Sequence, residues 1–117
     1  MINGKFVNSV EGRTFDTYNP STEEKIATIQ EAGSKDVDLA VKAAKKAFDH
    51  GPWRKMSAYE RGRILYKLGD LIEANREELA HLDTIDNGKP YQYTIDDAPY
   101  AAKIFRYFAG CADKIHG

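Results

Sequence analysis

The first third of the chain carries short hydrophobic runs separated by turn-forming residues, a pattern that predicts strands. Residues 5–12 form a first predicted strand, which ends at Gly12, and residues 14–18 form a second. The sequence Asn-Pro-Ser-Thr that follows is typical of a turn, and three of the four residues in 26–29 are β-branched. Residues 1–33 are therefore predicted to fold as short strands that include a β-hairpin.

From residue 34 onward the hydrophobic spacing changes to steps of three and four residues, which predicts helices. Ser34 begins the first helix, while Gly51 caps it and Pro52 stops it. Its apolar face consists of Val37, Val41, Ala44 and Phe48.

A second predicted helix begins with a capping box formed by Ser57 and Glu60. We expect it to bend or break near residues 74–75 and then to continue to Ile85, where the sequence DNGKP closes it. One broad apolar face is made by Ile64, Leu68, Leu71, Ile72, Leu79 and Leu82.

The last helix is predicted over residues 97–116, with Pro99 in its first turn and Gly117 as its cap. Its apolar side is predicted to be Ala101, Ile104, Phe105, Phe108 and Ala112. The chain as it stands is thus predicted to be an α+β fold, with a β-hairpin in residues 1–33 and about four helices in residues 34–117. A two-stranded hairpin needs a sheet, a helix or another subunit to cover it.

Length, charge and cysteine content narrow the class of protein. One domain is the default for 117 residues. The 17 basic and 18 acidic residues leave a net charge of −1, which disfavours nucleic acid and anionic membranes as partners.

A single cysteine, Cys111, excludes a disulfide framework within the chain and favours a reducing compartment. No secretory signal is visible and no apolar run reaches the ~20 residues of a membrane span, so we expect a cytoplasmic protein, or a mitochondrial matrix protein if a transit peptide is missing.

Few residue patterns point to chemistry. Cys111 and His116 are five residues apart, so on a helix they face different directions, and a small structural thiol is the favoured interpretation. The histidines, His50, His81 and His116, lack metal-binding spacing. No glycine-rich phosphate loop is present.

The acidic pairs are Asp36 with Asp38, Asp83 with Asp86, and Asp96 with Asp97. The first pair is typical of a helix start, and the second of a solvated helix end. Arg61 and Arg63 fit a solvated helix face better than a nucleic-acid patch.

Four segments in order resemble the NAD(P)-dependent aldehyde dehydrogenase superfamily, closest to its acetaldehyde/retinaldehyde-type branch. They are INGKFVNSVEGRTFDTYNPSTEEKIATI, DVDLAVKAAKKAFDHGPWRKMSAYERGRILYKLGDLIE, DNGKPY and FRYFAGCADKIHG. The resemblance covers essentially the whole chain. It implies that residues 1–117 are the N-terminal part of an α/β Rossmann-like cofactor-binding domain and that the catalytic domain is absent.

The resemblance also implies an activity for the parent protein, the oxidation of an aldehyde to a carboxylic acid with NAD or NADP. The catalytic cysteine, glutamate and asparagine and the cofactor-binding loop would lie beyond this chain. The chain alone is then expected to be inactive and to bind no cofactor. Cys111 does not match the family's nucleophile and stands where close relatives usually carry Trp. The implied partners are the rest of the polypeptide or a homo-oligomer, and a small aldehyde substrate.

Two sets of residues are carried over from the family by position. Asp96, Tyr100 and Ile104 match positions at the mouth of the substrate tunnel. The Asp86 carboxylate and backbone carbonyls near Thr17 and Tyr18 match the ligands of a structural alkali cation.

The alternative hypothesis is a stand-alone, non-catalytic module that docks on a protein partner through its sheet edge and apolar helix faces. A folded species of one size with cooperative unfolding would favour this module, whereas a molten species would favour a fragment.

Overall fold

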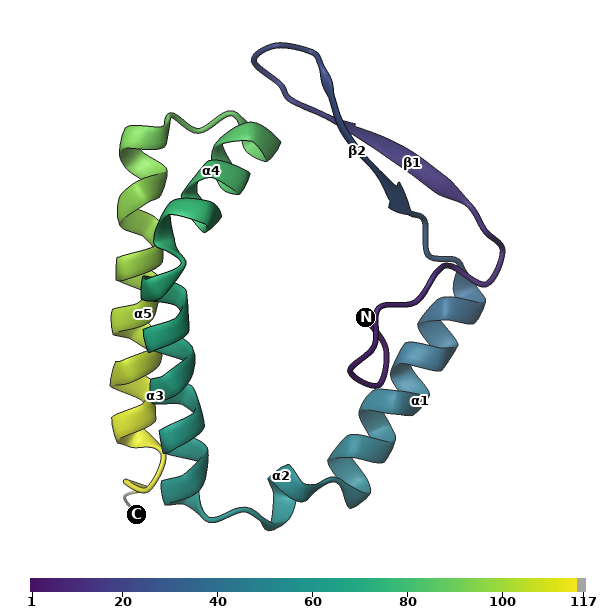
Figure 1. Cartoon of the computed structure of the whole chain (residues 1–117). Coiled ribbons are helices and arrows are strands. Elements are labelled where there is room, and N and C mark those ends of the chain that lie inside the picture. Colours follow the sequence, from purple (N-terminus) through teal and green to yellow (C-terminus); the bar gives the residue numbers. More distant parts are fainter. Residues whose placement is uncertain (116–117) are drawn as a thin grey trace. The chain divides into compact units, whose positions relative to one another are not determined.

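The computed structural model describes residues 1–115, which form one hairpin and five helices (Figure 1). The elements are β1 (Thr14–Tyr18), β2 (Lys25–Gln30), α1 (Ser34–His50), α2 (Pro52–Lys55), α3 (Ala58–Ala74), α4 (Arg76–Asn87) and α5 (Tyr91–Cys111). The predicted hairpin followed by about four helices is confirmed, with α2 as an additional single turn. The chain divides into two compact units, one of Met1–Tyr18 with Lys25–Lys55 and one of Asn19–Glu24 with the residues from Met56 onward.

The hairpin is antiparallel, with Phe15 paired to Ile29, and its ladder is irregular between Thr17 and Tyr18. Asn19 organises the connecting loop, as the predicted turn chemistry requires. The Asn19 carbonyl accepts from the Glu23 N–H at 2.8 Å, and its side-chain oxygen accepts from the Ser21 N–H at 2.9 Å. Such side-chain contacts two residues along the chain are the reason that asparagine favours turns.

The predicted strand over residues 5–12 is wrong. Lys5 forms a single bridge, to Ile2, around a reversal at Asn3 and Gly4, both of which have positive φ. The Val10 N–H donates to the side chain of Asp36 rather than to a neighbouring strand. Hydrophobic residues in this segment suggested a strand, but its backbone groups are bound by turns and by the side chains of Asp36 and Gln30 instead.

Helix α1 begins at Ser34, as predicted, and ends where Gly51 donates its N–H to the Ala47 carbonyl at 2.8 Å. Pro52 does not only stop α1, because it is also the first residue of α2, a position that suits proline. The predicted apolar face of α1 exists, yet it is uncovered: Val41 and Phe48 are exposed.

The capping box of α3 is confirmed by reciprocal hydrogen bonds. The Glu60 N–H donates to Ser57 Oγ at 3.2 Å, and the Ser57 N–H donates to Glu60 Oε2 at 3.1 Å. The predicted break is also confirmed, since Asn75 separates α3 from α4 and its side chain donates to the Leu71 carbonyl at 2.7 Å. Helix α4 runs two residues past the predicted end, to the left-handed cap at Gly88.

The predicted start of the last helix is wrong, because α5 begins at Tyr91 rather than at residue 97. Pro90 is its N-cap, and the Pro90 carbonyl accepts from the Tyr93 and Thr94 N–H groups. A hydrogen bond of 2.9 Å between the hydroxyls of Thr84 and Thr94 ties this first turn to α4. Pro99 therefore lies inside the helix, where it removes one backbone hydrogen bond without ending the helix.

Helix α5 ends at Cys111, and the next residues form a turn in which the Lys114 N–H donates to the Cys111 carbonyl. The prediction that the helix continues through residues 112–115 is wrong. The predicted last turn at His116 and the cap at Gly117 lie outside the described residues.

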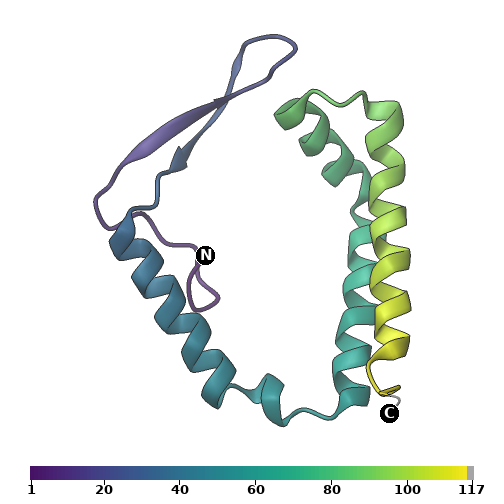
Figure 2. The ribbon, with the colours of Figure 1, turned by 180° about the vertical axis from the view of Figure 1, so that it is seen from behind.

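Helices α3 and α5 pack side by side along a seam of small residues, which both views of the ribbon show (Figure 2). A Cβ atom on Gly62 would lie 2.7 Å from the Ala109 carbonyl oxygen, and one on Gly69 would lie 3.0 Å from that of Ala102. The buried residues of α5 are Thr94, Ala98, Ala102 and Ala109. Of the predicted apolar side of α5, Ala101, Phe105 and Ala112 are half-buried, whereas Ile104 and Phe108 are exposed.

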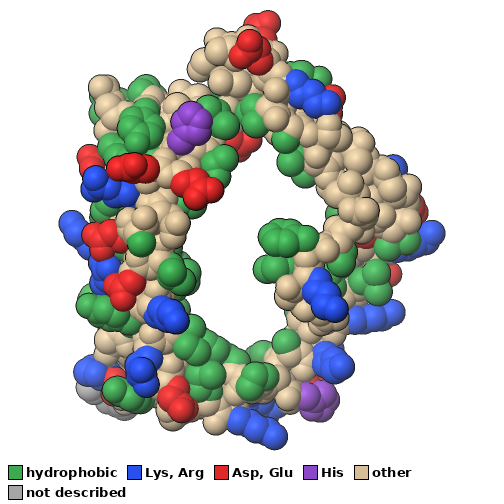
Figure 3. Space-filling view, viewed as in Figure 1, with side chains coloured by type: hydrophobic (Ala, Val, Ile, Leu, Met, Phe, Trp, Pro, Cys, Tyr) green, Lys and Arg blue, Asp and Glu red, His purple; other side chains and the backbone are tan. Residues whose placement is uncertain are grey.

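Large hydrophobic side chains consequently lie at the surface of each unit (Figure 3). In the second unit they include Ile64, Leu71 and Leu82 from the predicted broad face of α3 and α4. None of the described helices is both long enough and apolar enough to cross a membrane.

Candidate functional site

The predicted tunnel-mouth residues share one face of α5. Asp96, Tyr100 and Ile104 follow one another at four-residue steps, which places their side chains in one row. All three are exposed, whereas Ala98 and Ala102 are buried on the side of α5 that packs in the bundle. The structure thus brings the three residues together on a free face.

A groove of about 300 Å³ between α3 and α5 was not predicted from the sequence. Gly62 and Ala109 are part of its lining, where the backbone of α5 lies close to Gly62 of α3. Tyr59, Tyr66 and Arg106 also line it. The sequence signal is the glycine inside a predicted helix, because such a glycine often marks a close approach of two backbones.

Arg106 ties α5 to α3. Its Nη2 atom donates to Asp70 Oδ1 at 2.7 Å and to Glu73 Oε2 at 2.6 Å, while its guanidinium carbon lies 5.6 Å from the centre of the Tyr66 ring. The hydrogen bonds that Arg106 donates to Asp70 and then to Glu73 raise the pKa of Arg106 further above its usual range. The guanidinium is therefore a permanent cation that is already neutralised within the bundle.

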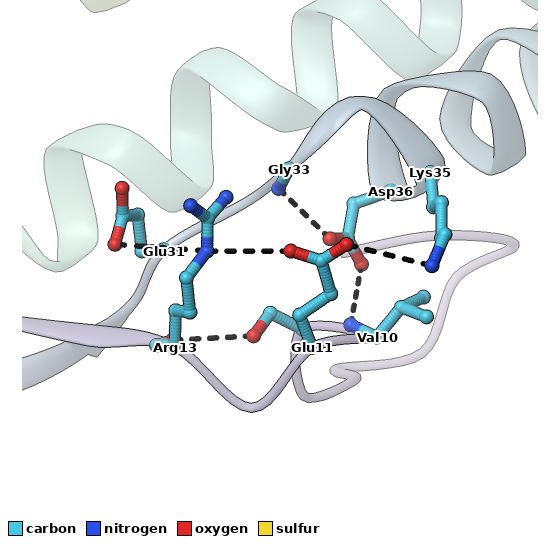
Figure 4. Close-up of polar contacts among 8 residues, drawn as sticks. Val10, Glu11, Arg13, Glu31, Gly33, Lys35 and Asp36 are labelled. Atoms are coloured by element: carbon cyan, nitrogen blue, oxygen red, sulfur yellow. Dashed lines mark hydrogen bonds and ion pairs between the residues drawn. The ribbon is translucent and has the colours of Figure 1, made fainter.

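A second polar centre forms around Asp36 at the start of α1 (Figure 4). Its Oδ2 atom accepts from the Gly33 N–H at 2.9 Å, and its Oδ1 atom accepts from the Val10 N–H at 2.9 Å. Asp36 as a whole residue is almost fully buried, with 7% exposure. These two hydrogen bonds, first that from Gly33 and then that from Val10, lower the pKa of Asp36 below its ordinary value.

Asp36 therefore has two roles. The predicted role at the helix start is confirmed by the bond from Gly33. The bond from Val10 fixes the N-terminal segment to α1, and sequence reasoning missed it because the two residues are 26 positions apart. Surface ion pairs of Glu11 with Arg13 and Lys35 surround this centre (Figure 4), but exposed pairs of this kind contribute little to stability.

Acid should release the N-terminal segment through Asp36. Because the folded-state pKa lies below the unfolded one, the carboxylate stabilises the fold above about pH 4, and this contribution is lost as the pH falls through the folded pKa. We expect Asp36→Ala to abolish the hydrogen-exchange protection of the Val10 amide at neutral pH, while Asp38→Ala, on the exposed side of the same turn, leaves it intact. An NMR titration in which the Asp36 carboxyl titrates at or above the ordinary value would contradict this account.

The remaining candidates for chemistry stay apart. Cys111 is exposed at the end of α5, and the predicted geometry relative to His116 falls outside the described residues. Within residues 1–115 there is no group of three or more His, Cys, Asp or Glu side chains that could hold a metal ion. Asp83 accepts from Asn87 Nδ2 at 2.5 Å in the last turns of α4, in line with the predicted helix-end role.

The two predicted arginines differ in their surroundings. Arg61, in the first turn of α3, donates to the Met56 carbonyl at 2.6 Å and so holds the segment that precedes the helix. Arg63 lines the groove between α3 and α5. The predicted cation ligands belong to both units: Thr17 and Tyr18 end β1, and Asp86 lies in the last turn of α4.

The geometry of the described residues does not identify a protein family, but comparison with known proteins does. A sequence model described as the aldehyde dehydrogenase family matches residues 6–117. Among curated proteins, aldehyde dehydrogenase family 2 member B4, mitochondrial, of Arabidopsis thaliana is 56% identical over all of this chain and 22% of its own length. The mitochondrial aldehyde dehydrogenase of Rattus norvegicus is 52% identical over all of this chain and 23% of its own length.

Solved structures agree with the sequence matches. The NAD+ complex of aldehyde dehydrogenase from Bacillus cereus superposes with a TM-score of 0.94 at 52% identity, over 99% of this chain and 24% of that one. An NAD-dependent aldehyde dehydrogenase from Sinorhizobium meliloti gives a TM-score of 0.95 at 40% identity, over 100% of this chain and 24% of that one. The chain belongs to the aldehyde dehydrogenase family and spans about a quarter of the length of the relatives it matches.

Proposed function

We propose that this chain forms the N-terminal part of the cofactor-binding domain of an NAD(P)-dependent aldehyde dehydrogenase whose parent protein oxidises an aldehyde to a carboxylic acid. The observation that carries the proposal is the match to the Bacillus cereus enzyme, a TM-score of 0.94 over 99% of this chain. The exposed apolar faces support it, because Val41, Phe48 and Leu71 need a covering layer that a larger α/β domain supplies.

In this proposal the chain contributes framework rather than reacting groups. Arg106 and the glycine–alanine seam hold α3 against α5, and Asp36 holds the N-terminal segment against α1. NAD or NADP would accept the hydride in the parent. The resemblance places the catalytic cysteine, glutamate and asparagine of the family beyond these residues, and Cys111 does not match that cysteine, so the chain alone is expected to be inactive.

The exposed row on α5 is the part of the chain proposed to meet the substrate. Asp96, Tyr100 and Ile104 would line the mouth of the substrate tunnel in the parent, where the tyrosine would narrow or polarise the entrance. A small aldehyde is the proposed substrate. The alkali-cation ligands, Asp86 and the carbonyls near Thr17 and Tyr18, stay a prediction that rests on the family resemblance.

The other partners and the compartment are proposed from the family as well. The partner of these 117 residues would be the rest of the dehydrogenase polypeptide, within a homo-oligomer. Relatives such as those of Arabidopsis thaliana and Rattus norvegicus carry the word mitochondrial in their names. A cytoplasmic or a mitochondrial matrix location is therefore proposed.

A second candidate function is a non-catalytic module that docks on a protein partner. The uncovered apolar face of α1 favours it, because monomeric proteins rarely expose contiguous apolar surface without a partner.

An immunoblot of the native source with an antibody against residues 1–117 separates the two functions. The chain is 13.2 kDa and covers 24% of relatives such as the Bacillus cereus enzyme, so the dehydrogenase proposal predicts a band roughly four times larger. A single band at 13.2 kDa would contradict that proposal and favour the docking module.

A further inference from the structure

The tripeptide Asn-Gly-Lys occurs twice in the chain, at residues 3–5 and at residues 87–89. In both copies the asparagine is exposed and the glycine has a positive φ, 73° at Gly4 and 82° at Gly88. The backbone nitrogen of a glycine reaches the side chain of a preceding asparagine more readily than that of any other residue, because glycine has no Cβ atom to restrict the backbone. Sequence and exposure therefore do not distinguish the two copies, whereas their hydrogen bonds do.

The second copy is held by hydrogen bonds at the end of α4. Asn87 donates from Nδ2 to Asp83 Oδ1 at 2.5 Å, and its Oδ1 atom accepts from the Lys89 N–H at 2.7 Å. The Gly88 N–H donates to the Thr84 carbonyl at 2.9 Å as part of the helix cap. Both the carboxamide of Asn87 and the nitrogen that follows it must therefore break hydrogen bonds before they can meet.

The first copy lacks such restraints. Asn3 and Gly4 form the centre of a tight turn, in which the flanking residues Ile2 and Lys5 exchange two backbone hydrogen bonds of 2.9 and 3.1 Å. Within residues 1–115, neither the Asn3 carboxamide nor the Gly4 N–H takes part in a hydrogen bond. The Gly4 nitrogen can therefore approach the side chain of Asn3 without breaking a hydrogen bond of its own.

We propose that Asn3 is a site of spontaneous deamidation, and that Asn87, in the same tripeptide, is protected from it. The deprotonated backbone nitrogen of Gly4 attacks Cγ of Asn3, and the new C–N bond closes a cyclic imide. The side-chain NH2 group leaves as ammonia and takes up the proton that the Gly4 nitrogen has lost. Water then adds to either carbonyl of the ring and opens it to aspartate or isoaspartate, so water is the only co-reactant.

The product changes the turn at residues 2–5 and little else. Either product replaces a neutral amide by a carboxylate, and isoaspartate also lengthens the backbone by one methylene group. The hydrogen bond from the Val10 N–H to Asp36 lies outside this turn and continues to hold the segment to α1. Met1 and Ile2 line a cavity of about 250 Å³ beside α1, so the modification alters the wall of that cavity.

Peptide mapping by mass spectrometry compares both copies within one protein. The sample is a folded chimera in which this chain replaces the matching quarter of the Bacillus cereus enzyme, incubated at mildly alkaline pH. We expect Asn3 to deamidate at least about ten times faster than Asn87, because hydrogen bonds have to break only at the second copy. In concentrated urea the two rates should converge, since the tripeptides are the same. Asn3→Gln should remove the reaction at the first copy, because the longer side chain closes its ring much more slowly.

Asp83→Ala tests the protection of the second copy directly. This variant removes the acceptor of the Asn87 carboxamide, so deamidation of Asn87 should become about threefold faster while that of Asn3 stays unchanged. Equal rates in the folded chimera, a difference that persists in urea, or an unchanged rate at Asn87 in the Asp83→Ala variant would each overturn the proposal. The masses of two peptides are measured, so the result does not depend on whether the parent protein oxidises an aldehyde.

Discussion

Replacing Gly62 by valine is expected to destabilise the packing of α3 on α5 by about 3 kcal/mol. A Cβ atom at this position would lie 2.7 Å from the carbonyl oxygen of Ala109, a distance that real Cβ atoms do not adopt. The oxygen belongs to the backbone of α5, so it cannot rotate away as a flexible side chain could. The helices must separate, and the hydrogen bonds of Arg106 to α3 are then strained as well.

Urea unfolding of a chimera in which this chain replaces the matching quarter of the Bacillus cereus enzyme, followed by far-UV circular dichroism, measures this effect, because the chain then has the rest of its domain around it. Gly110→Ala is the matched control in the same helix pair, because a Cβ built on Gly110 would meet no atom within 4 Å apart from its chain neighbours and the backbone of its own helix. That substitution should stabilise the protein by about 0.5 kcal/mol, through the higher helix propensity of alanine. Equal unfolding midpoints for the Gly62→Val variant and the unmodified chain would contradict the close-packed seam.

Local signals in the sequence predicted most element boundaries correctly. Ser57 and Glu60 specify the start of α3 through two reciprocal hydrogen bonds. The S-x-x-E pattern of these two residues can be recognised in the sequence. Asn75 marks the break between α3 and α4, and Gly88 the end of α4. Each of these features depends on residues within four positions of one another, which is why sequence alone suffices.

The wrong predictions of secondary structure occur where a contact with a residue far away in the sequence determines the local structure. Residues 5–12 carry strand-like hydrophobic residues, but the Val10 N–H is bound by Asp36, a contact across 26 positions. Helix α5 starts six residues before its predicted start because Thr94 bonds to Thr84 on α4, which favours helix in a segment that looked like a loop. Pro99 then suggested a helix start, although a proline is also tolerated inside a helix that tertiary contacts hold.

The buried face of the helices was the least predictable feature. Hydrophobic periodicity assigns the core to the largest apolar side chains, such as Ile104 and Phe108, yet the seam uses Gly62, Gly69 and Ala102. Large residues left outside the seam are consistent with a chain that is one part of a larger fold. For the same reason Asp96, Tyr100 and Ile104 could be placed on one exposed row of α5, whereas their position at a tunnel mouth stays a prediction.

Transplantation of this chain into a relative is the second prediction with a large effect. The chain is 52% identical to the matching quarter of the Bacillus cereus enzyme and superposes on it with a TM-score of 0.94. If residues 1–117 supply framework, a chimera in which they replace that quarter should fold and keep aldehyde-dependent NADH formation within about tenfold, because no reacting group is exchanged. The same chimera with Gly62→Val should lose most of its folded yield.

The activity of this chimera is the measurement that tests the central claim most directly. The account predicts NADH formation by the purified chimera, and none by the 117-residue chain alone under the same conditions. The control is the Bacillus cereus enzyme with its own segment reinserted by the same steps. An inactive chimera beside an active control would contradict the claim that these residues form a working part of an aldehyde dehydrogenase cofactor-binding domain.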